Sequence, residues 1–231
     1  MKSNVFVLLV LILASGNIAF AQDSEAKVIS MPDFELSSEA KAAGIDGKLI
    51  VGLTIGADGK ASGMRVYGSP MWPCGSNAKD KVIEDVRDDV KRHLLSAKFG
   101  PAMKNGKPKS SDVQITFLLS ELFRKANDFK RIEENLKNGI TPSLVDVKNI
   151  DRYAITLPKQ LMGSRNTISY RLTEMQILVD ENGDVISAGG LRSGHMELRE
   201  ARKLVCDAKF KPLMLNQKAV KMTGAVMYGL Y

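Results

Sequence analysis

The chain has 231 residues, of which 44% are hydrophobic, 6% aromatic and 26% charged, and its formal net charge is +7. These values are typical of a globular protein and exclude collagen, low-complexity disorder and a membrane protein with several spans. At roughly 100–200 residues per domain, the length allows one large domain or two small ones.

Residues 1–21 have the pattern of a secretory signal peptide. Lys2 precedes an unbroken apolar run at 5–14, and Ala19-Phe20-Ala21 has the small-x-small form of a cleavage site. We therefore expect cleavage before Gln22 and a periplasmic protein. The alternative is an uncleaved inner-membrane anchor facing the periplasm, because residues 5–21 together approach the roughly 20 apolar residues that span a bilayer.

The net positive charge indicates which classes of partner the protein can bind. Loss of residues 1–21, which include Lys2, changes the 231 residues and net charge of +7 to 210 residues and +6. An exported chain meets little nucleic acid, so we expect no nucleic-acid partner. The charge is better suited to an acidic protein or to an anionic envelope surface.

An internal repeat shows how the chain is organised. Residues 97–107 have the sequence AKFGPAMKNGK and residues 208–218 have AKFKPLMLNQK, with seven of eleven positions identical. The phenylalanines Phe99 and Phe210 are 111 residues apart, whereas the upstream turn glycines Gly59 and Gly183 are 124 apart. The first copy is therefore longer by 13 residues between these points, and the surplus falls around 69–75.

The first copy has the pattern of two strands, a helix and a third strand. Strands at 49–55 and 61–68 flank Asp58-Gly59, which suits a tight hairpin turn. Apolar residues at three- and four-residue spacing predict a helix over 77–97, and Pro101 prevents it from continuing. A closing strand follows at 113–119.

The second copy repeats this order after a connector. An amphipathic helix is predicted over 121–138, followed by a segment with no clear period. The second copy then has strands at 175–179 and 185–191 around Asn182-Gly183, a helix over 197–208 and a closing strand at 220–228.

These elements predict an α+β protein made of two tandem β-β-α-β units, each a three-stranded antiparallel sheet plus a helix, joined by an amphipathic connector helix. The expected boundaries are a signal peptide at 1–21, a lead-in at 22–43, the first unit at 44–119, connector and linker at 120–169, and the second unit at 170–231. Each unit alone is small for independent stability, so we expect the two to pair.

This order of motifs resembles the C-terminal domain of the TonB energy-transducer family. The matching pattern is a glycine-led strand at 44–51, the turn Ala57-Asp58-Gly59-Lys60, and Phe99-Gly100-Pro101-Ala102 leading through 105–108 into the last strand. The second copy matches more loosely, since Gln217 replaces the loop glycine. The resemblance covers roughly 44–119 well and 170–229 moderately.

The resemblance implies a periplasmic module that binds extended segments of outer-membrane transporters or other envelope proteins by adding a strand to a sheet edge. A true transducer of transmembrane transport also needs a retained anchor, a long Pro-rich spacer and an inner-membrane motor partner. Residues 22–43 are short and contain only Pro32. We therefore expect a non-catalytic binding module, with an anchored transducer and a self-associating structural protein, such as a homodimer, as alternatives.

Four residues are candidates for partner binding. Val113, Ile115 and Phe117 lie in the closing strand of the first unit, whose edge is the expected site of strand addition. Trp72, the only tryptophan, lies in the inserted loop. It can contact a partner, since exposed aromatic residues often do, or plug one end of its own core.

The remaining chemistry is sparse. Cys74 and Cys206 are candidates for a disulfide in an oxidising compartment, the alternative being two free thiols. His93 and His195 are the only histidines, and no CxxC or HxxxH spacing predicts a metal site. No nucleotide-binding glycine motif or nucleophile-base pattern occurs, so we expect no enzyme activity, no catalytic residues and no cofactor.

Overall fold

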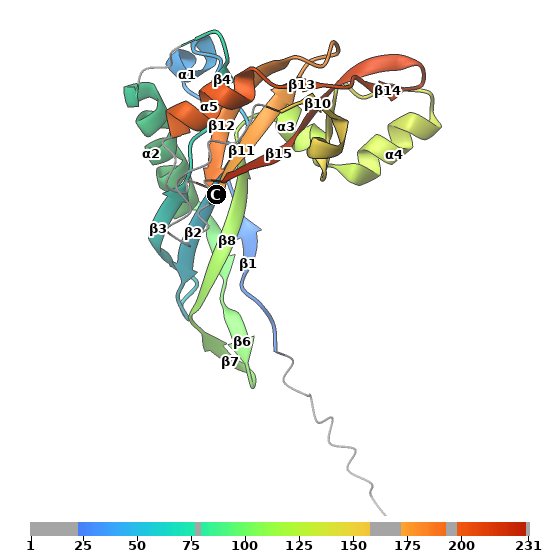
Figure 1. Ribbon diagram of the computed structural model, residues 1–231. Helices are drawn as coiled ribbons and strands as arrows, with labels where there is room; N and C mark the ends of the chain where they lie inside the picture. The colour runs from blue at the N-terminus through green and yellow to red at the C-terminus, as the bar shows by residue number, and fades with distance from the viewer. Residues whose placement is uncertain (1–22, 77–79, 158–171, 193–197, 230–231) are drawn as a thin grey trace, which may run out of the picture.

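The computed structural model describes residues 23–76, 80–157, 172–192 and 198–229, and it has an α+β architecture (Figure 1). Two sheets carry most of the fold. The first sheet has the strand order β3-β2-β8, and the second has the order β14-β15-β11-β12-β4 with β9 also paired to β15. None of the described helices is long and apolar enough to cross a membrane.

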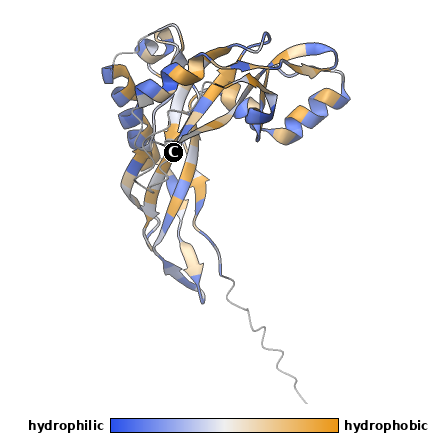
Figure 2. Ribbon diagram, viewed as in Figure 1, coloured by the Kyte–Doolittle hydropathy of each residue, from blue (hydrophilic) through white to orange (hydrophobic). Residues whose placement is uncertain are grey.

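The first sheet consists of β2 (Lys48–Ile55), β3 (Ala61–Tyr67) and β8 (Ser111–Leu118), with β2 in the centre. Alternate residues of β2 turn to one face, and Leu49, Val51 and Ile55 there are fully buried. The helix α2 (Asp80–Ser96) contributes the facing apolar residues of this core. Figure 2 shows hydrophobic and hydrophilic residues alternating along α2, as its amphipathic pattern predicts. The short helix α1 (Ser38–Ala42) packs on α2.

The second sheet is built around β11 (Leu172–Val179), β12 (Val185–Arg192) and β15 (Lys218–Gly229), with α5 (Leu198–Cys206) packed on it. It has six strands, not the three that the sequence predicts. The additional strands are β4 (Trp72–Pro73), β9 (Leu144–Asp146) and β14 (Leu213–Leu215). Two of them come from the inserted loop and the connector, which offer backbone groups to edges that would otherwise stay unpaired.

The connector contains two helices, so the prediction of a single helix over 121–138 is wrong. The helix α3 (Glu121–Ala126) ends at Asn127, whose side chain donates a hydrogen bond to the carbonyl of Phe123. The helix α4 (Phe129–Lys137) begins anew at Asp128, whose carboxylate accepts from the Arg131 amide. An aspartate that caps a new helix competes with continuation of the preceding one.

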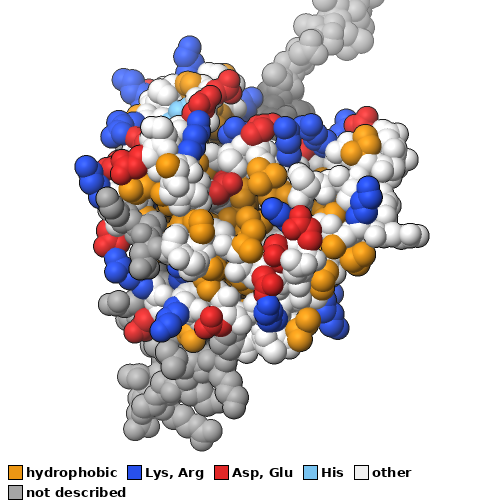
Figure 3. All heavy atoms as spheres, turned by 90° about the horizontal axis from the view of Figure 1, so that it is seen from above, with side chains coloured by type: hydrophobic (Ala, Val, Ile, Leu, Met, Phe, Trp, Pro, Cys, Tyr) orange, Lys and Arg blue, Asp and Glu red, His pale blue; other side chains and the backbone are white. Residues whose placement is uncertain are grey.

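Shorter strands pair beside the two sheets. They are β1 (Lys27–Ser30) with β5 (Lys98–Gly100), β6 (Ala102–Lys104) with β7 (Lys107–Lys109), and β10 (Ala154–Thr156) with β13 (Lys209–Phe210), while Ile150–Tyr153 form a 3-10 turn. Charged side chains rim the end of the molecule seen in Figure 3, with hydrophobic atoms gathered across its middle.

The same glycine contact occurs beside each sheet. Gly59 and Gly183 have φ angles of +77° and +86°, and a Cβ on either would lie 2.6 Å or 1.9 Å from the carbonyl oxygen of Phe99 or Phe210. Because a side chain at either turn would collide with that carbonyl, the hairpin glycine and the phenylalanine form one packing unit, which explains why both recur.

The strand that pairs with the phenylalanine also recurs. Val28 lies opposite Phe99 with Ser30 opposite Lys98, and Ala154 lies opposite Phe210 with Thr156 opposite Lys209, each with the same register shift. The sequences VISMP at 28–32 and AITLP at 154–158 are 126 residues apart and carry this correspondence. This similarity is a signal that the sequence analysis missed, and it relates β1, which lies within the expected lead-in at 22–43, to β10.

The turn between β14 and β15 places Gln217 in a strained backbone conformation, which a substitution can test. Gln217 has a φ of +61°, where the corresponding Gly106 has +71°. We predict that Gln217→Gly raises the free energy of unfolding by about 0.5–1 kcal/mol, because relief of left-handed strain outweighs the extra entropy of glycine in the unfolded chain. Urea denaturation measures this change. Gln217→Ala is the control and gives no such gain, and an equal gain from alanine contradicts the explanation.

Candidate functional site

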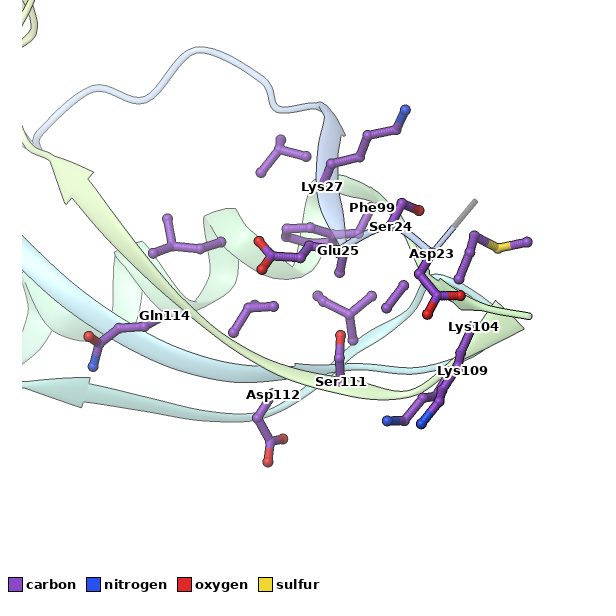
Figure 4. A pocket seen from close by; sticks show the side chains of 17 residues that line it. Asp23, Ser24, Glu25, Lys27, Phe99, Lys104, Lys109, Ser111, Asp112 and Gln114 are labelled. Carbon is purple, nitrogen blue, oxygen red and sulfur yellow. The ribbon is translucent and has the colours of Figure 1, made fainter. Parts of the chain in front are cut away.

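A groove of about 690 Å³ lies between β8 and residues 23–28, which include the start of β1 (Figure 4). Its volume is in the range of ordinary ligand pockets, roughly 300–1,000 Å³. One wall is the segment Asp23–Val28, and the other is the first half of β8, from Ser111 to Ile115. Phe99 and Ile55 contribute apolar surface.

The wall formed by β8 is an edge strand. Within the described residues β8 pairs with β2 alone. The Leu119 amide donates to the Gly47 carbonyl at 2.9 Å, and this pair continues the antiparallel register of β2 with β8. Hydrogen-bonded pairs alternate along such a ladder, so the backbone groups of 111, 113, 115 and 117 point to β2, and those of 112, 114, 116 and 118 point away from it.

The register decides what the predicted binding residues can do. Phe117 is 3% exposed, and Val113 and Ile115 are partly buried against the core of the first sheet. Their backbone groups are used by β2. These three residues therefore hold the strand in place, and the backbone groups of Asp112 and Thr116 face away from β2.

Figure 4 shows the same alternation in the side chains. Ser111 and Glu25 point into the groove, and Asp112 points away from it. The Ser111 hydroxyl is buried and has no hydrogen-bond partner among the described residues. Lys104 and Lys109 lie at one end of the groove. The site thus offers backbone edge, a buried hydroxyl and nearby cations.

The corresponding place beside the second sheet is filled. By the 111-residue spacing β15 corresponds to β8, and β9 runs parallel to it from Lys221 to Thr223. The Val147 amide donates to the Thr223 carbonyl at 2.8 Å. Ile150 is completely buried in the core of the second sheet.

By sequence spacing, two buried residues beside the second sheet correspond to two serines that line the groove. By the 126-residue spacing Ser24 corresponds to Ile150, and by the 111-residue spacing Ser111 corresponds to Met222. Ile150 and Met222 are both fully buried, whereas both serines line the groove. Val113 corresponds to Gly224 of the second sheet, and its larger side chain occupies part of the space in the groove. A Cβ added to Gly224 would lie 2.8 Å from the Cβ of Ile150.

Trp72 lies inside the molecule and not on a binding surface. It is 7% exposed and forms β4 with Pro73, paired to Ser187 and Ala188 of β12. The guanidinium of Arg202 stacks on its ring at 4.3 Å. Of the two roles expected for Trp72, its burial agrees with packing in the core, at the place where the inserted loop meets the second sheet.

The inserted loop also carries the disulfide. Cys74 and Cys206 are bonded, with an S–S distance of 2.09 Å, and tie the loop to α5. Close backbone approach accompanies this bond, since a Cβ on Gly189 would lie 2.1 Å from the Pro70 carbonyl oxygen. We call the contact between residues 68–76 and the second sheet the seam.

Buried polar groups lie in the seam and beside it. Gln176 is fully buried, accepts from the Lys48 amide at 2.8 Å and donates to the Lys48 carbonyl at 2.7 Å. Burial lowers the pKa of Arg202 to about 10, and its guanidinium donates to the carbonyls of Trp72, Pro73 and Ala188. Burial raises the pKa of Asp46, which a hydrogen bond from Ser120 partly opposes. The buried positive charge of Arg202 is therefore stabilised by hydrogen bonds to backbone carbonyls that point toward it.

His93 is the one histidine among the described residues, and it packs against aromatic rings. The ring of His93 packs edge-on against Phe34 and Phe117, at 5.2 Å and 5.5 Å between centroids. His195 lies outside the described residues. Among the residues that the structure describes, no group of three or more His, Cys, Asp or Glu side chains is placed to hold a metal ion.

No protein-family model matches the chain, and no curated protein is significantly similar to it.

The disulfide across the seam gives a stability prediction. The bond joins residues 132 positions apart, and replacing both cysteines with alanine is expected to lower the free energy of unfolding by about 4–5 kcal/mol through the larger entropy of the unfolded chain. Denaturant unfolding with and without reductant measures it. The double variant should show no further loss on reduction, and a wild-type chain unaffected by reductant contradicts the prediction.

Proposed function

We propose that the chain consists of two copies of one β-β-α-β unit related to the C-terminal domain of the TonB family. The support is the recurrence of contacts with the sequence repeat. The hairpin glycine meets the phenylalanine carbonyl in both halves, and β1 and β10 pair with β5 and β13 in the same register. Each unit then includes an additional leading strand, so the first begins near residue 27 and not at residue 44.

We propose that the protein is a non-catalytic periplasmic binding module that captures an extended protein segment by strand addition to β8. One observation carries this proposal. The edge of β8 borders an open groove, whereas the corresponding edge of β15 is extended by β9. An edge strand offers unpaired N–H and C=O groups that an extended segment can satisfy.

The arrangement at β15 supplies the expected geometry of capture. There the added strand β9 runs parallel to β15. The amide of Val147, next to β9, donates to the outward-facing carbonyl of Thr223. On β8 the 111-residue spacing places an incoming strand opposite residues 110–112, and a strand that stays extended beyond this point runs toward Thr116. Its far edge would face residues 23–28, so the segment would lie between two walls and not on an open surface.

The partner that suits this proposal is an exported envelope protein with an accessible extended segment, such as an outer-membrane transporter. The expected removal of residues 1–21 and the net charge of +6 that remains both fit a partner outside the cytoplasm. An extended segment from a terminus or a loop can enter the groove without unfolding its own domain.

Photo-crosslinking in the host organism tests the proposal. A photoreactive amino acid is placed at Thr116, on the edge of β8, and in a second variant at Arg65, on the exposed opposite edge strand β3. We expect a specific envelope protein to crosslink at position 116 and not at 65, because only the β8 edge borders the groove. Mass spectrometry of the crosslinked product identifies the partner.

A matched pair of substitutions separates strand addition from ordinary side-chain contact. Thr116→Pro removes an outward-facing amide, which an edge strand tolerates, and Thr116→Ala keeps it. With the photoreactive group moved to position 112, we expect loss of the crosslink in the proline variant alone. Ile115→Pro is not suitable, since its amide pairs with β2. Equal crosslinking in both Thr116 variants contradicts strand addition.

A further inference from the structure

The hairpin formed by β6 and β7 carries a surface that the proposed binding function does not use. We propose that the face of this hairpin with Lys104, Lys107 and Lys109, which we call the lysine face, docks on an anionic phospholipid membrane. The inference concerns a different surface from the edge of β8 and does not depend on strand addition.

Strand pairing places the three lysines together. Lys104 lies opposite Lys107, and Lys109 lies opposite Ala102. Opposite residues of an antiparallel pair share a face, as do alternate residues of one strand, so the three lysine side chains lie on one face of the hairpin. Figure 4 shows the side chains of Lys104 and Lys109 pointing the same way. All three residues are exposed.

The molecule itself does not neutralise this charge. Within the described residues, none of the three lysines forms an ion pair with an acidic side chain. The carboxylate of Asp23 instead accepts from the Asn105 amide at 2.8 Å, and Glu25 points into the groove. Like charges directly opposite each other in a sheet repel, so Lys104 and Lys107 destabilise the hairpin unless an anionic partner covers them.

Positive charge is concentrated at this end of the molecule. The segments 23–31 and 97–109, which form β1, β5, β6 and β7, contain five lysines and two acidic residues and so have a net charge of +3. The chain without residues 1–21 has a net charge of +6, so these two short segments carry half of it. Figure 1 shows β6 and β7 at the opposite end of the molecule from the second sheet.

The repeat does not require these lysines. By the 111-residue spacing the corresponding positions of the second unit are Leu215, Lys218 and Val220, which carry one charge in place of three. Both units form the hairpin, since β14 pairs with the start of β15 as β6 pairs with β7. The additional lysines are therefore a property of the first unit alone and are not needed to form the hairpin.

The chain brings this hairpin close to the bilayer during export. Asp23 is bonded to Asn105 in the turn, and Ser24 exchanges two backbone hydrogen bonds with Met103. The apolar run at 5–14 is joined to Asp23 through residues 15–22, which span at most roughly 30 Å even when fully extended. Until the expected cleavage releases it, this run holds the hairpin within that distance of the membrane.

The kind of cation favours a membrane over a structured protein surface. Every cation of the segments 23–31 and 97–109 is a lysine, and neither segment contains arginine. Arginine recognises carboxylates in a fixed bidentate geometry, whereas lysine is a point charge on a flexible stem. A fluid layer of anionic headgroups needs no fixed geometry, and it attracts lysines that lie within a Debye length of its surface.

Co-sedimentation with vesicles tests the inference. The mature chain, residues 22–231 with the disulfide intact, is mixed with vesicles of phosphatidylglycerol and phosphatidylethanolamine, and in parallel with vesicles of phosphatidylcholine alone. We expect binding to the anionic vesicles only. High salt should abolish it, because the Debye length falls from about 30 Å at 0.01 M to about 3 Å at 1 M ionic strength. The apolar run is absent from the mature chain and cannot contribute.

A matched pair of double variants locates the contact. K104Q/K107Q removes two charges from the lysine face, and K27Q/K98Q removes two from β1 and β5, where Lys27 points away from Lys104 and Lys109 (Figure 4). At about fivefold per lysine near an anionic surface, we expect the first variant to lower the partition coefficient roughly thirtyfold. The second should lower it by less than about threefold, through net charge alone.

Thermal unfolding confirms that both variants fold, and K104Q/K107Q should be at least as stable as the unaltered chain because the repulsion is relieved. Equal losses of binding from the two variants overturn docking by the lysine face, as does failure to bind anionic vesicles or equal binding to phosphatidylcholine. A blocked oligoglutamate peptide tests the other class of partner. If K104Q/K107Q weakens binding of this peptide while the unaltered chain ignores the vesicles, the lysine face serves an acidic protein and the membrane inference is wrong. None of these results bears on strand addition, which the crosslink at Thr116 tests.

Discussion

The arrangement of the molecule depends on the seam. Residues 68–76 lie against β12 so closely that glycine is required, and Trp72, Arg202 and the disulfide of Cys74 with Cys206 lock this approach from the side of α5. Gln176 binds both backbone groups of Lys48 and so joins the central strands of the two sheets. Each sheet alone is a small structure with a core of its own, and the seam joins the two.

The seam also determines which strand edges the other sheet leaves uncovered. By bringing the sheets together at β2, β4 and β12, it leaves their closing strands, β8 and β15, to meet other segments. The connector then covers the start of β15 with β9 and anchors itself through Asp146 to Lys48 of the first sheet. The first sheet receives no such segment within the described residues. The difference between the two halves thus follows from connectivity, because a connector between two units precedes only the second.

The residues beside β8 and those beside β15 differ in size at two corresponding positions. Where the second half has Ile150 and Met222, both fully buried, the first has Ser24 and Ser111. Losing two large aliphatic side chains removes the filling from the space beside the strand and leaves a polar atom facing it. The space beside β8 therefore differs from the corresponding place beside β15, which β9 and Ile150 fill.

The sequence by itself determined the local elements and their repetition. Apolar periodicity placed α2 and α5, Asp58-Gly59 and Asn182-Gly183 placed the hairpins, and the 111-residue repeat related the closing strands, because these features depend on neighbours close along the chain. Only the tertiary structure decided that Trp72 is buried, that Val113, Ile115 and Phe117 face inward, and that β8 pairs with β2 alone among the described strands. These outcomes depend on strand register and on segments more than a hundred residues away, and side-chain pattern alone does not specify which distant edge a short strand will join.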